Sequence, residues 1–414
     1  MAEIRPFNAL RPRPEFAKQV ASRPYDVLNS EEAAIEAKDN PISFLHITKS
    51  EIDLPSVTDI HSQVVYDRAK ENLLALINKD NVLFREEKPC YYIYQLIMPA
   101  RQAGGNGRSQ TGLVCVSSVA DYFDDKIKKH EFTRPEKEKD RIEHMLTIRA
   151  QTGNVFLACR NVDELDQVME NWKKEHTPVY DFKADDDIQH TVWVVDDEAV
   201  IDNITEIFQK KVPHTYIADG HHRAASAAKV SKQLPESENA AYFLTTIFPE
   251  NQLAILDYNR VVKDLNGMTA AEFRGQLQDD FYITLSPVPV APSQLHEFGM
   301  YLDGQWYILV SRPGTFTDDP VGVLDVSILS ANVLDKILDI RDQRTDKRVD
   351  FVGGIRGLKE LEKRVDSGEM KVAFSFFPVT IQQLFDIADN GNVMPPKSTW
   401  FEPKLRDGLL THLI

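Results

Sequence analysis

The chain has 414 residues, which is long for one compact core, so two domains or one domain with a large elaboration are expected. Hydrophobic residues make up 42% and charged residues 27%, which is typical of a soluble globular protein and excludes a disordered or fibrous chain. The 48 basic and 64 acidic residues give a net charge of −16, which disfavours nucleic acid as a partner because a phosphate backbone is repelled.

Membrane and disulfide chemistry are also disfavoured. No stretch approaches the roughly 18 apolar residues of a membrane span, and the start MAEIRPFNALRPRPEF lacks the apolar region of a signal peptide. A cytoplasmic protein is therefore expected. Cys90, Cys115 and Cys159 are widely separated, which predicts buried, reduced thiols and no zinc site. Nothing in the sequence fixes the oligomeric state.

Several elements are predicted before residue 120. Residues 29–32 (NSEE) place a capping side chain before two acids, as at a helix start. SFLHI (43–47) has the composition of a strand, and residues 59–79 carry apolar side chains at helical spacing. YYIYQLIM (91–98) and GLVCVSSV (112–119) predict a hairpin with a long loop between its strands.

The middle of the chain alternates strands and helices. After a polar helical region interrupted at Pro135, short strands are predicted in NVFLACR (154–160), TVWVVDD (191–197), HTYIADG (214–220) and AAYFLTTIF (240–248). Helices are expected between some of them, and the order strand, helix, strand, helix, strand over residues 190–248 is typical of an α/β core.

The pattern of predicted strands and helices changes near residue 262. This change predicts one domain over 1–262 and a second over 263–414. In the second, the Asp-Gly of YLDGQWYILVSR (301–312) predicts a hairpin. DVSILSANVLDKIL (325–338) predicts a helix, and MKVAFSFFPV (370–379) a strand.

The stretch HTYIADGHHRAAS (214–226) carries the strongest indication of function. It leads from an apolar strand through Asp219 and Gly220 into a helix rich in alanine. Glycine permits a backbone conformation that other residues avoid, and a helix start presents unpaired N–H groups with partial positive charge. His221, His222 and Arg223 add donors there, so residues 219–223, the DGHHR box, predict a phosphate cradle.

Asp219 is suited to hold a magnesium ion against the same phosphates or to orient a histidine. The alternative for the whole box is an ordinary turn with exposed histidines and a surface arginine. Zinc ligation by His221 and His222 together is disfavoured, because neighbours on a helix point about 100° apart and one face needs an i, i+4 pair.

The DGHHR box resembles the nucleotide-phosphate box of the ParB/sulfiredoxin-like superfamily, most closely that of its free-serine kinases. Across nearly the whole chain, the order of motifs is similar to the domain of unknown function 1015 family. The motifs are RPFNALRP (5–12), RPYDVL (23–28), KKHEFTRPEKEKDR (128–141), YIADGHHR (216–223), DYNRVVKDL (257–265), LDVSIL (324–329) and MPPKSTWFEPKL (394–405). The resemblance implies an α+β protein: a ParB/sulfiredoxin-like mixed α/β core, a long N-terminal elaboration and a smaller C-terminal α+β domain.

A serine kinase makes O-phospho-L-serine from free L-serine and a nucleoside phosphate. The resemblance therefore implies a small-molecule kinase that uses ATP or ADP with Mg²⁺, with Gly220, His221, His222 and Arg223 holding the nucleotide. This chain departs from the serine kinases in being much longer, and their catalytic glutamate has no clear counterpart in it.

Two carboxylates are candidates for the base that accepts the hydroxyl proton. Glu131 lies in a dense polar motif, although Thr133 and Glu136 there also fit the capping box of a helix start. Asp26 follows Pro24 and Tyr25 in an N-terminal loop, where a turn or helix cap is the alternative. Histidines 221 and 222 complete the catalytic candidates.

Recognition of a free amino acid needs groups for its carboxylate and ammonium. Arg101 and Arg108 lie among glycines in RQAGGNGRSQ (101–110), a loop suited to close over a ligand, with a mobile hairpin tip as the alternative. His130, next to Glu131, is a further candidate for acceptor binding. Lys397, between prolines and Trp400, is expected to reach a phosphate from the second domain, with structural packing as the alternative.

Two other functions would use the same cradle: a ParB-like nucleotide-binding switch, and a nucleotide or phosphoester hydrolase. A non-catalytic interaction protein would leave the clustered polar residues of the box unexplained.

Overall fold

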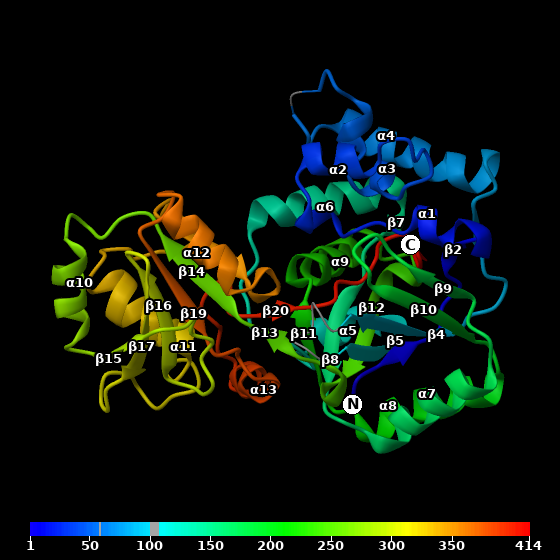
Figure 1. Cartoon of the computed structure of the whole chain (residues 1–414). Helices are drawn as coiled ribbons and strands as arrows, with labels where there is room; N and C mark the ends of the chain where they lie inside the picture. Colours follow the sequence, from blue (N-terminus) through cyan, green and yellow to red (C-terminus); the bar gives the residue numbers. More distant parts are fainter. Residues whose placement is uncertain (58, 100–106) are drawn as a thin grey trace. The chain divides into compact units, whose positions relative to one another are not determined.

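The computed structural model describes residues 1–57, 59–99 and 107–414 (Figure 1). The chain divides into unit 1, which holds residues 1–253 and 403–414, and unit 2, which holds residues 254–402. The division expected at residue 262 differs from this one, because the last residues return to unit 1. There β21 (His412–Leu413) pairs antiparallel with β7 (Ala150–Gln151).

Unit 1 is built on a nine-stranded mixed sheet with the order β6-β11-β8-β12-β5-β4-β10-β9, and β1 beside β5. β12 runs parallel to β8 and β11 parallel to β6, while the remaining pairs are antiparallel. The bounds are β1 Ile4–Arg5, β4 Tyr91–Met98, β5 Arg108–Ser118, β6 Ile127–Lys128, β8 Val155–Cys159, β9 Tyr180–Lys183, β10 Gln189–Val195, β11 Thr215–Asp219 and β12 Tyr242–Pro249. The mixed α+β class and the predicted strands at 91, 112, 154, 191, 214 and 240 are therefore confirmed.

The helices of unit 1 lie in layers above this sheet and around it. They are α1 Ala17–Val20, α2 Ser30–Glu36, α3 Leu45–Thr48, α4 Gln63–Leu74, α5 Val119–Phe123, α6 Pro135–Ile148, α7 Asp163–Glu175, α8 Glu198–Lys211 and α9 His221–Gln233, and a short ribbon joins β2 (Leu10–Pro12) to β3 (Leu83–Arg85). One apolar cluster holds side chains of the sheet together with those of α7, α8 and α9. α6 lies between α9 and the group α2 to α4, so α9 is enclosed (Figure 1).

One local prediction was wrong, and one alternative reading is not met. Residues 45–48 form the helix α3 and not a strand; Phe44, Leu45 and Ile47 are all fully buried, and a short apolar run does not distinguish a strand from a buried helix. Thr133 does not cap α6, which begins at Pro135 after Arg134 with no side-chain cap. The helix start at Asn29 is confirmed, with a complete capping box to Glu32.

Unit 2 contains a six-stranded antiparallel sheet with the order β15-β17-β16-β19-β14-β18. The predicted hairpin forms around Asp303 and Gly304, both with positive φ. The bounds are β13 Ile255–Leu256, β14 Tyr258–Val262, α10 Ala270–Leu277, β15 Phe281–Ser286, β16 Glu297–Leu302, β17 Gln305–Ser311, α11 Asp325–Leu329, β18 Val349–Gly353, α12 Leu358–Asp366, β19 Val372–Phe376, α13 Ile381–Asp389 and β20 Trp400–Phe401.

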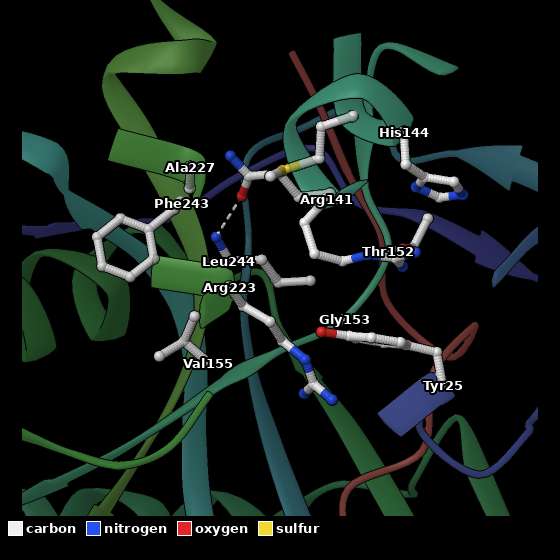
Figure 2. A pocket seen from close by; sticks show the side chains of 12 residues that line it. Tyr25, Arg141, His144, Thr152, Gly153, Val155, Arg223, Ala227, Phe243 and Leu244 are labelled. Atoms are coloured by element: carbon white, nitrogen blue, oxygen red, sulfur yellow. Dashed lines mark hydrogen bonds between the residues drawn. The ribbon is translucent and has the colours of Figure 1, made fainter. Parts of the chain in front are cut away.

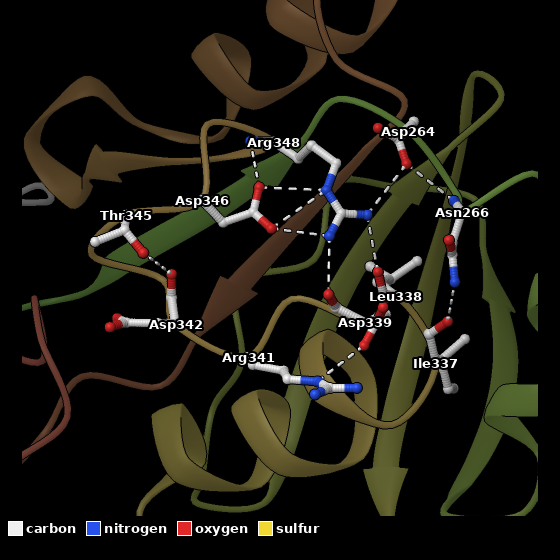
Figure 3. Close-up of polar contacts among 10 residues, drawn as sticks. All are labelled: Asp264, Asn266, Ile337, Leu338, Asp339, Arg341, Asp342, Thr345, Asp346 and Arg348. Atoms are coloured by element: carbon white, nitrogen blue, oxygen red, sulfur yellow. Dashed lines mark hydrogen bonds and ion pairs between the residues drawn. The ribbon is translucent and has the colours of Figure 1, made fainter.

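The loop after α11 in unit 2 is fastened by one guanidinium (Figure 3). Arg348 donates from Nη1 to the carbonyl of Leu338 and from Nη2 to the carbonyl of Asp339, both at 2.9 Å, and it pairs with the Asp346 carboxylate. These contacts hold the backbone of residues 338–339 against Arg348, and we assign them a structural role.

Candidate functional site

The DGHHR box forms the bend between β11 and α9. Gly220 occupies the N-cap position of α9 with φ 97°, a left-handed conformation that other residues adopt only with strain. A methyl group there would lie 3.4 Å from the Cα of Val155 in the neighbouring strand. Ala224, Ala227 and Ala228 are buried, so α9 approaches the sheet closely. The backbone shape that a phosphate cradle requires is therefore present.

Asp219, at the end of β11, is paired with a lysine from the last residues of the chain. Nζ of Lys404 donates to Oδ2 of Asp219 at 2.7 Å. Burial favours the neutral acid, but Lys404 and Arg223 outweigh it and hold the pKa of Asp219 far below its usual range. Asp219 is therefore a fixed negative charge that brings an ammonium group to the box.

Arg223 points from α9 toward the N-terminal loop. Its Nη2 donates to Oδ1 of Asp26 at 2.9 Å, and its Nη1 donates to the carbonyl of Asn154 at 2.8 Å. The Nε atom is buried and has no hydrogen-bond partner within the described part of the chain. The structure thus brings Asp26 to the box, and it leaves one guanidinium donor unused.

The two histidines of the box hold the segment that precedes α6. Nε2 of His222 accepts the backbone N–H of Arg134 at 3.0 Å, and Nε2 of His221 accepts that of His130 at 3.4 Å. The Nδ1 atom of His221 lies 3.7 Å from Oε2 of Glu131, and burial lowers the pKa of His221 well below its usual value, so the imidazole is neutral. His130 and Glu131 therefore lie beside the box, while their roles in acceptor binding and as base stay predictions.

Arg223 also lines a pocket (Figure 2). Arg141 from α6 and Arg223 from α9 both line it, and the ring of Tyr25 lies 4.0 Å and 5.3 Å from their guanidinium carbons. The volume of the pocket is about 30 Å³. The remaining lining residues are His144, Met145, Gln151, Thr152, Gly153, Val155, Ala227, Phe243 and Leu244.

Three further residues were predicted for the site: Arg101, Arg108 and Lys397. Arg101 lies outside the described residues. Arg108 is the first residue of β5, and its Nη2 donates to the carbonyl of Gln252 at 3.2 Å. Lys397 belongs to unit 2, where its ammonium nitrogen lies 5.8 Å from the centre of the Tyr258 ring. Their parts in binding stay predictions.

The described residues hold no group of three or more His, Cys, Asp and Glu side chains that could bind a metal ion. Lys404 occupies Oδ2 of Asp219, and a role of Asp219 as a magnesium ligand stays a prediction. No helix among the residues that the structure covers is long and apolar enough to cross a membrane. All three cysteines are free and buried, as predicted.

The sequence model of a family described as protein of unknown function (DUF1015) matches residues 4–327. The chain belongs to the DUF1015 family. Searched against curated proteins, it gives no match. Among solved structures, this DUF1015 protein is similar to a conserved hypothetical protein from Pyrococcus furiosus (15% identity, 72% of this chain and 94% of that chain, TM-score 0.36). It is also similar to a free serine kinase in complex with AMP (14%, 72% and 91%, TM-score 0.36), and to SbnI with a C-terminal truncation from Staphylococcus aureus (11%, 72% and 87%, TM-score 0.34).

Residues 403–414 of this DUF1015 protein lie beyond the matched part, yet they supply two side chains that sequence reasoning missed. Lys404 pairs with Asp219. Asp407 is buried, and a methyl group placed on Gly153 would lie 3.2 Å from its Oδ1 and 3.3 Å from Nε of Arg223, so the two side chains are close neighbours. Burial raises the pKa of Asp407 to about 7, against the opposing charge of Arg223. Lys404 and Asp407 are far from residues 219–223 in the sequence, and no motif or hydrophobic periodicity identifies them as site residues.

Proposed function

We propose that this protein is a small-molecule kinase that transfers a phosphoryl group from ATP or ADP to the hydroxyl of free L-serine. One observation supports the proposal most: the left-handed Gly220 starts α9 beside two cations, Lys404, which binds Asp219 at the end of β11, and Arg223, which binds the carbonyl of Asn154 just before β8. In a chain with a net charge of −16, cations gathered at a helix start indicate an anion site. The ParB/sulfiredoxin-like character of the box is part of the same proposal.

The reaction requires positioning and neutralisation of charge more than covalent chemistry by the protein. The serine hydroxyl oxygen attacks the terminal phosphorus of the donor, the bond from that phosphorus to the bridging oxygen breaks, and ADP or AMP leaves. The hydroxyl proton passes to a carboxylate. Glu131, with 48% of its side chain exposed, and Asp26, with 37%, are the two candidates, and Asp26 is already engaged by Arg223.

Magnesium enters this proposal only with the nucleotide. Protein sites for Mg²⁺ commonly combine few carboxylates with substrate phosphates. The pairing with Asp219 brings the ammonium group of Lys404 to the DGHHR box. The phosphates would therefore meet cationic side chains and the backbone N–H groups of the helix start.

The direct test is to incubate the full chain with L-serine, Mg²⁺ and either ATP or ADP, and to look for O-phosphoserine by mass spectrometry. We expect phosphoserine with the wild-type protein and with Asp185→Asn, a change at a fully exposed aspartate of the same unit. We expect none with Asp219→Asn.

The same assay separates the alternatives. Nucleotide consumption without phosphoserine would favour a hydrolase, and nucleotide binding without any turnover would favour a ParB-like switch. Failure to bind any nucleotide would contradict the kinase, the switch and a nucleotide hydrolase, since each of them places nucleotide phosphates at the box, and would leave only a phosphoester hydrolase.

A further inference from the structure

The pocket beside Arg223 has the size of a small polar group. Its volume of about 30 Å³ is room for roughly two water molecules, since a water needs about 10–15 Å³ measured in this way. A carboxylate with its adjoining carbon fits this space.

Two guanidinium groups give the pocket its chemistry. Arg141 is 12% exposed, and its Nε and Nη2 both donate to Oδ2 of Asp140, which fixes the orientation of the fork. Within the described residues, the buried Nε of Arg223 has no hydrogen-bond partner, and Arg141 reaches Asp140 through Nε and Nη2 and not through Nη1. Donors on two fixed guanidinium groups suit a planar, bidentate oxyanion.

Burial lowers the pKa of His144 to about 4, so this imidazole is neutral, and its Nε2 is hydrogen-bonded to the carbonyl of Ile47. Asp140 and Asp26 are each paired with one of the two arginines. The remaining charged neighbour is Asp407, which lies beside Arg223 and Gly153; burial raises its pKa to about 7, so below that pH it is mostly neutral and repels a bound carboxylate little. Met145, Val155 and Leu244 form an apolar wall that suits the carbon atoms of a small amino acid.

We propose that this pocket is the acceptor subsite, and that it holds the carboxylate of a small free amino acid between Arg141 and Arg223. The inference rests on the proposed kinase function and names the part of the site that recognises its acceptor. Arg223 belongs both to the pocket and to the DGHHR box, so an acceptor held here lies beside the phosphates that the box would bind.

Kinetics with matched substrates test the assignment. The variant Arg141→Lys keeps the positive charge but loses the fork, and Arg5→Lys, at a residue with 57% of its side chain exposed, is the matched control. We expect Arg141→Lys to raise the KM for L-serine by about tenfold or more, with the Kd for ADP changed less than about twofold. Ethanolamine, which is serine without the carboxylate, should show no such change.

A second variant tests the pocket independently, in case Arg141→Lys does not fold. Gly153→Ala adds a methyl group 3.2–3.4 Å from Asp407 and from the Nε end of Arg223, and it changes no charge. It too should raise the KM for L-serine and leave ethanolamine unaffected. An unchanged KM for L-serine in both variants overturns the subsite. A weakened Kd for ADP with an unchanged KM for L-serine also overturns it, because the pocket would then take a phosphate.

Binding measurements separate the subsite from the kinase proposal. If the wild-type protein phosphorylates nothing, calorimetric titration with L-serine and with L-serinamide still applies. Binding of L-serine that is lost in Arg141→Lys, with no binding of the amide, supports the subsite although the kinase proposal fails. Absence of L-serine binding by the wild-type protein overturns the subsite.

Discussion

At the scale of single residues, Asp219 is the negative charge to which the cations Lys404 and Arg223 of the site are attracted. Its pKa is held far below the usual range, mainly because Lys404 and Arg223 outweigh its burial, so it is ionised at every pH at which the protein would be assayed. We predict that Asp219→Asn abolishes phosphoserine formation, because the ammonium group of Lys404 loses its anchor. Circular dichroism should match that of the wild-type protein. Full activity in this variant would remove Asp219 from the mechanism.

Arg223 is predicted to carry nucleotide affinity. Its guanidinium is oriented by Asp26 and by the carbonyl of Asn154. Arg223→Ala should weaken binding of ADP by roughly 1.5–3 kcal/mol, the contribution of a hydrogen bond to a charged group. Calorimetric titration measures this, with Arg5→Ala as the control. An unchanged affinity would mean that the phosphates bind elsewhere.

Asp407 should make stability depend on pH in the direction opposite to an ordinary ion-paired aspartate. Burial raises its pKa to about 7, whereas the unfolded chain has a value of about 4, so the folded protein holds the extra proton between these values. The contribution of Asp407 to the free energy of unfolding therefore falls as pH rises from about 4 to about 7. Arg223, Asp26 and Arg141 are the charged neighbours that influence it.

The comparison of wild type with Asp407→Asn isolates this effect. Urea unfolding at pH 5 and at pH 7.5 should show the stability of the wild type falling, relative to the variant, by up to a few kcal/mol as the pH rises. An equal difference at both pH values would show that Asp407 does not titrate in this window.

At the scale of elements, the strands were predicted well because alternating or continuous apolar runs are local signals. YYIYQLIM became β4, and HTYIADG became β11 with the expected bend into α9. The partners of these strands were not predictable: β11 lies between β6 and β8, and β8 runs antiparallel to it. Pairing depends on packing between distant segments, which local periodicity does not contain.

Gly220 provides the test of the bend between strand and helix. Gly220→Ala should destabilise unit 1 by about 1–2 kcal/mol, because a residue with a side chain is strained at φ 97°. Gly275→Ala is the contrasting change, since Gly275 lies in α10 of unit 2 with nothing within 4 Å of the added methyl group, and alanine there should stabilise that helix by about 0.5–1 kcal/mol. Chemical denaturation measures both, and equal effects would contradict the role of the bend.

At the scale of the whole molecule, sequence reasoning placed a division near 262 but could not see that the chain returns to unit 1 at its end. The motif MPPKSTWFEPKL contains both Lys397 and Lys404, and composition alone does not say which lysine reaches the box. The division of the chain separates them: Lys397 belongs to unit 2 and Lys404 to unit 1. Such a return is fixed by the pairing of β21 with β7 and by buried side chains, both of which are tertiary contacts.

Removal of residues 403–414 tests this return. The shortened chain 1–402 loses β21, the Lys404 partner of Asp219 and the buried side chains of Leu409 and Leu410. Each buried leucine is worth about 1.5–3 kcal/mol, so the unfolding transition of unit 1 should move to a clearly lower temperature. The fragment 254–402, which has its own sheet and apolar core, should unfold cooperatively and identify the transition of unit 2 in calorimetric scans. A shortened chain whose unit 1 melts at the wild-type temperature would show that the C-terminal segment does not support the site.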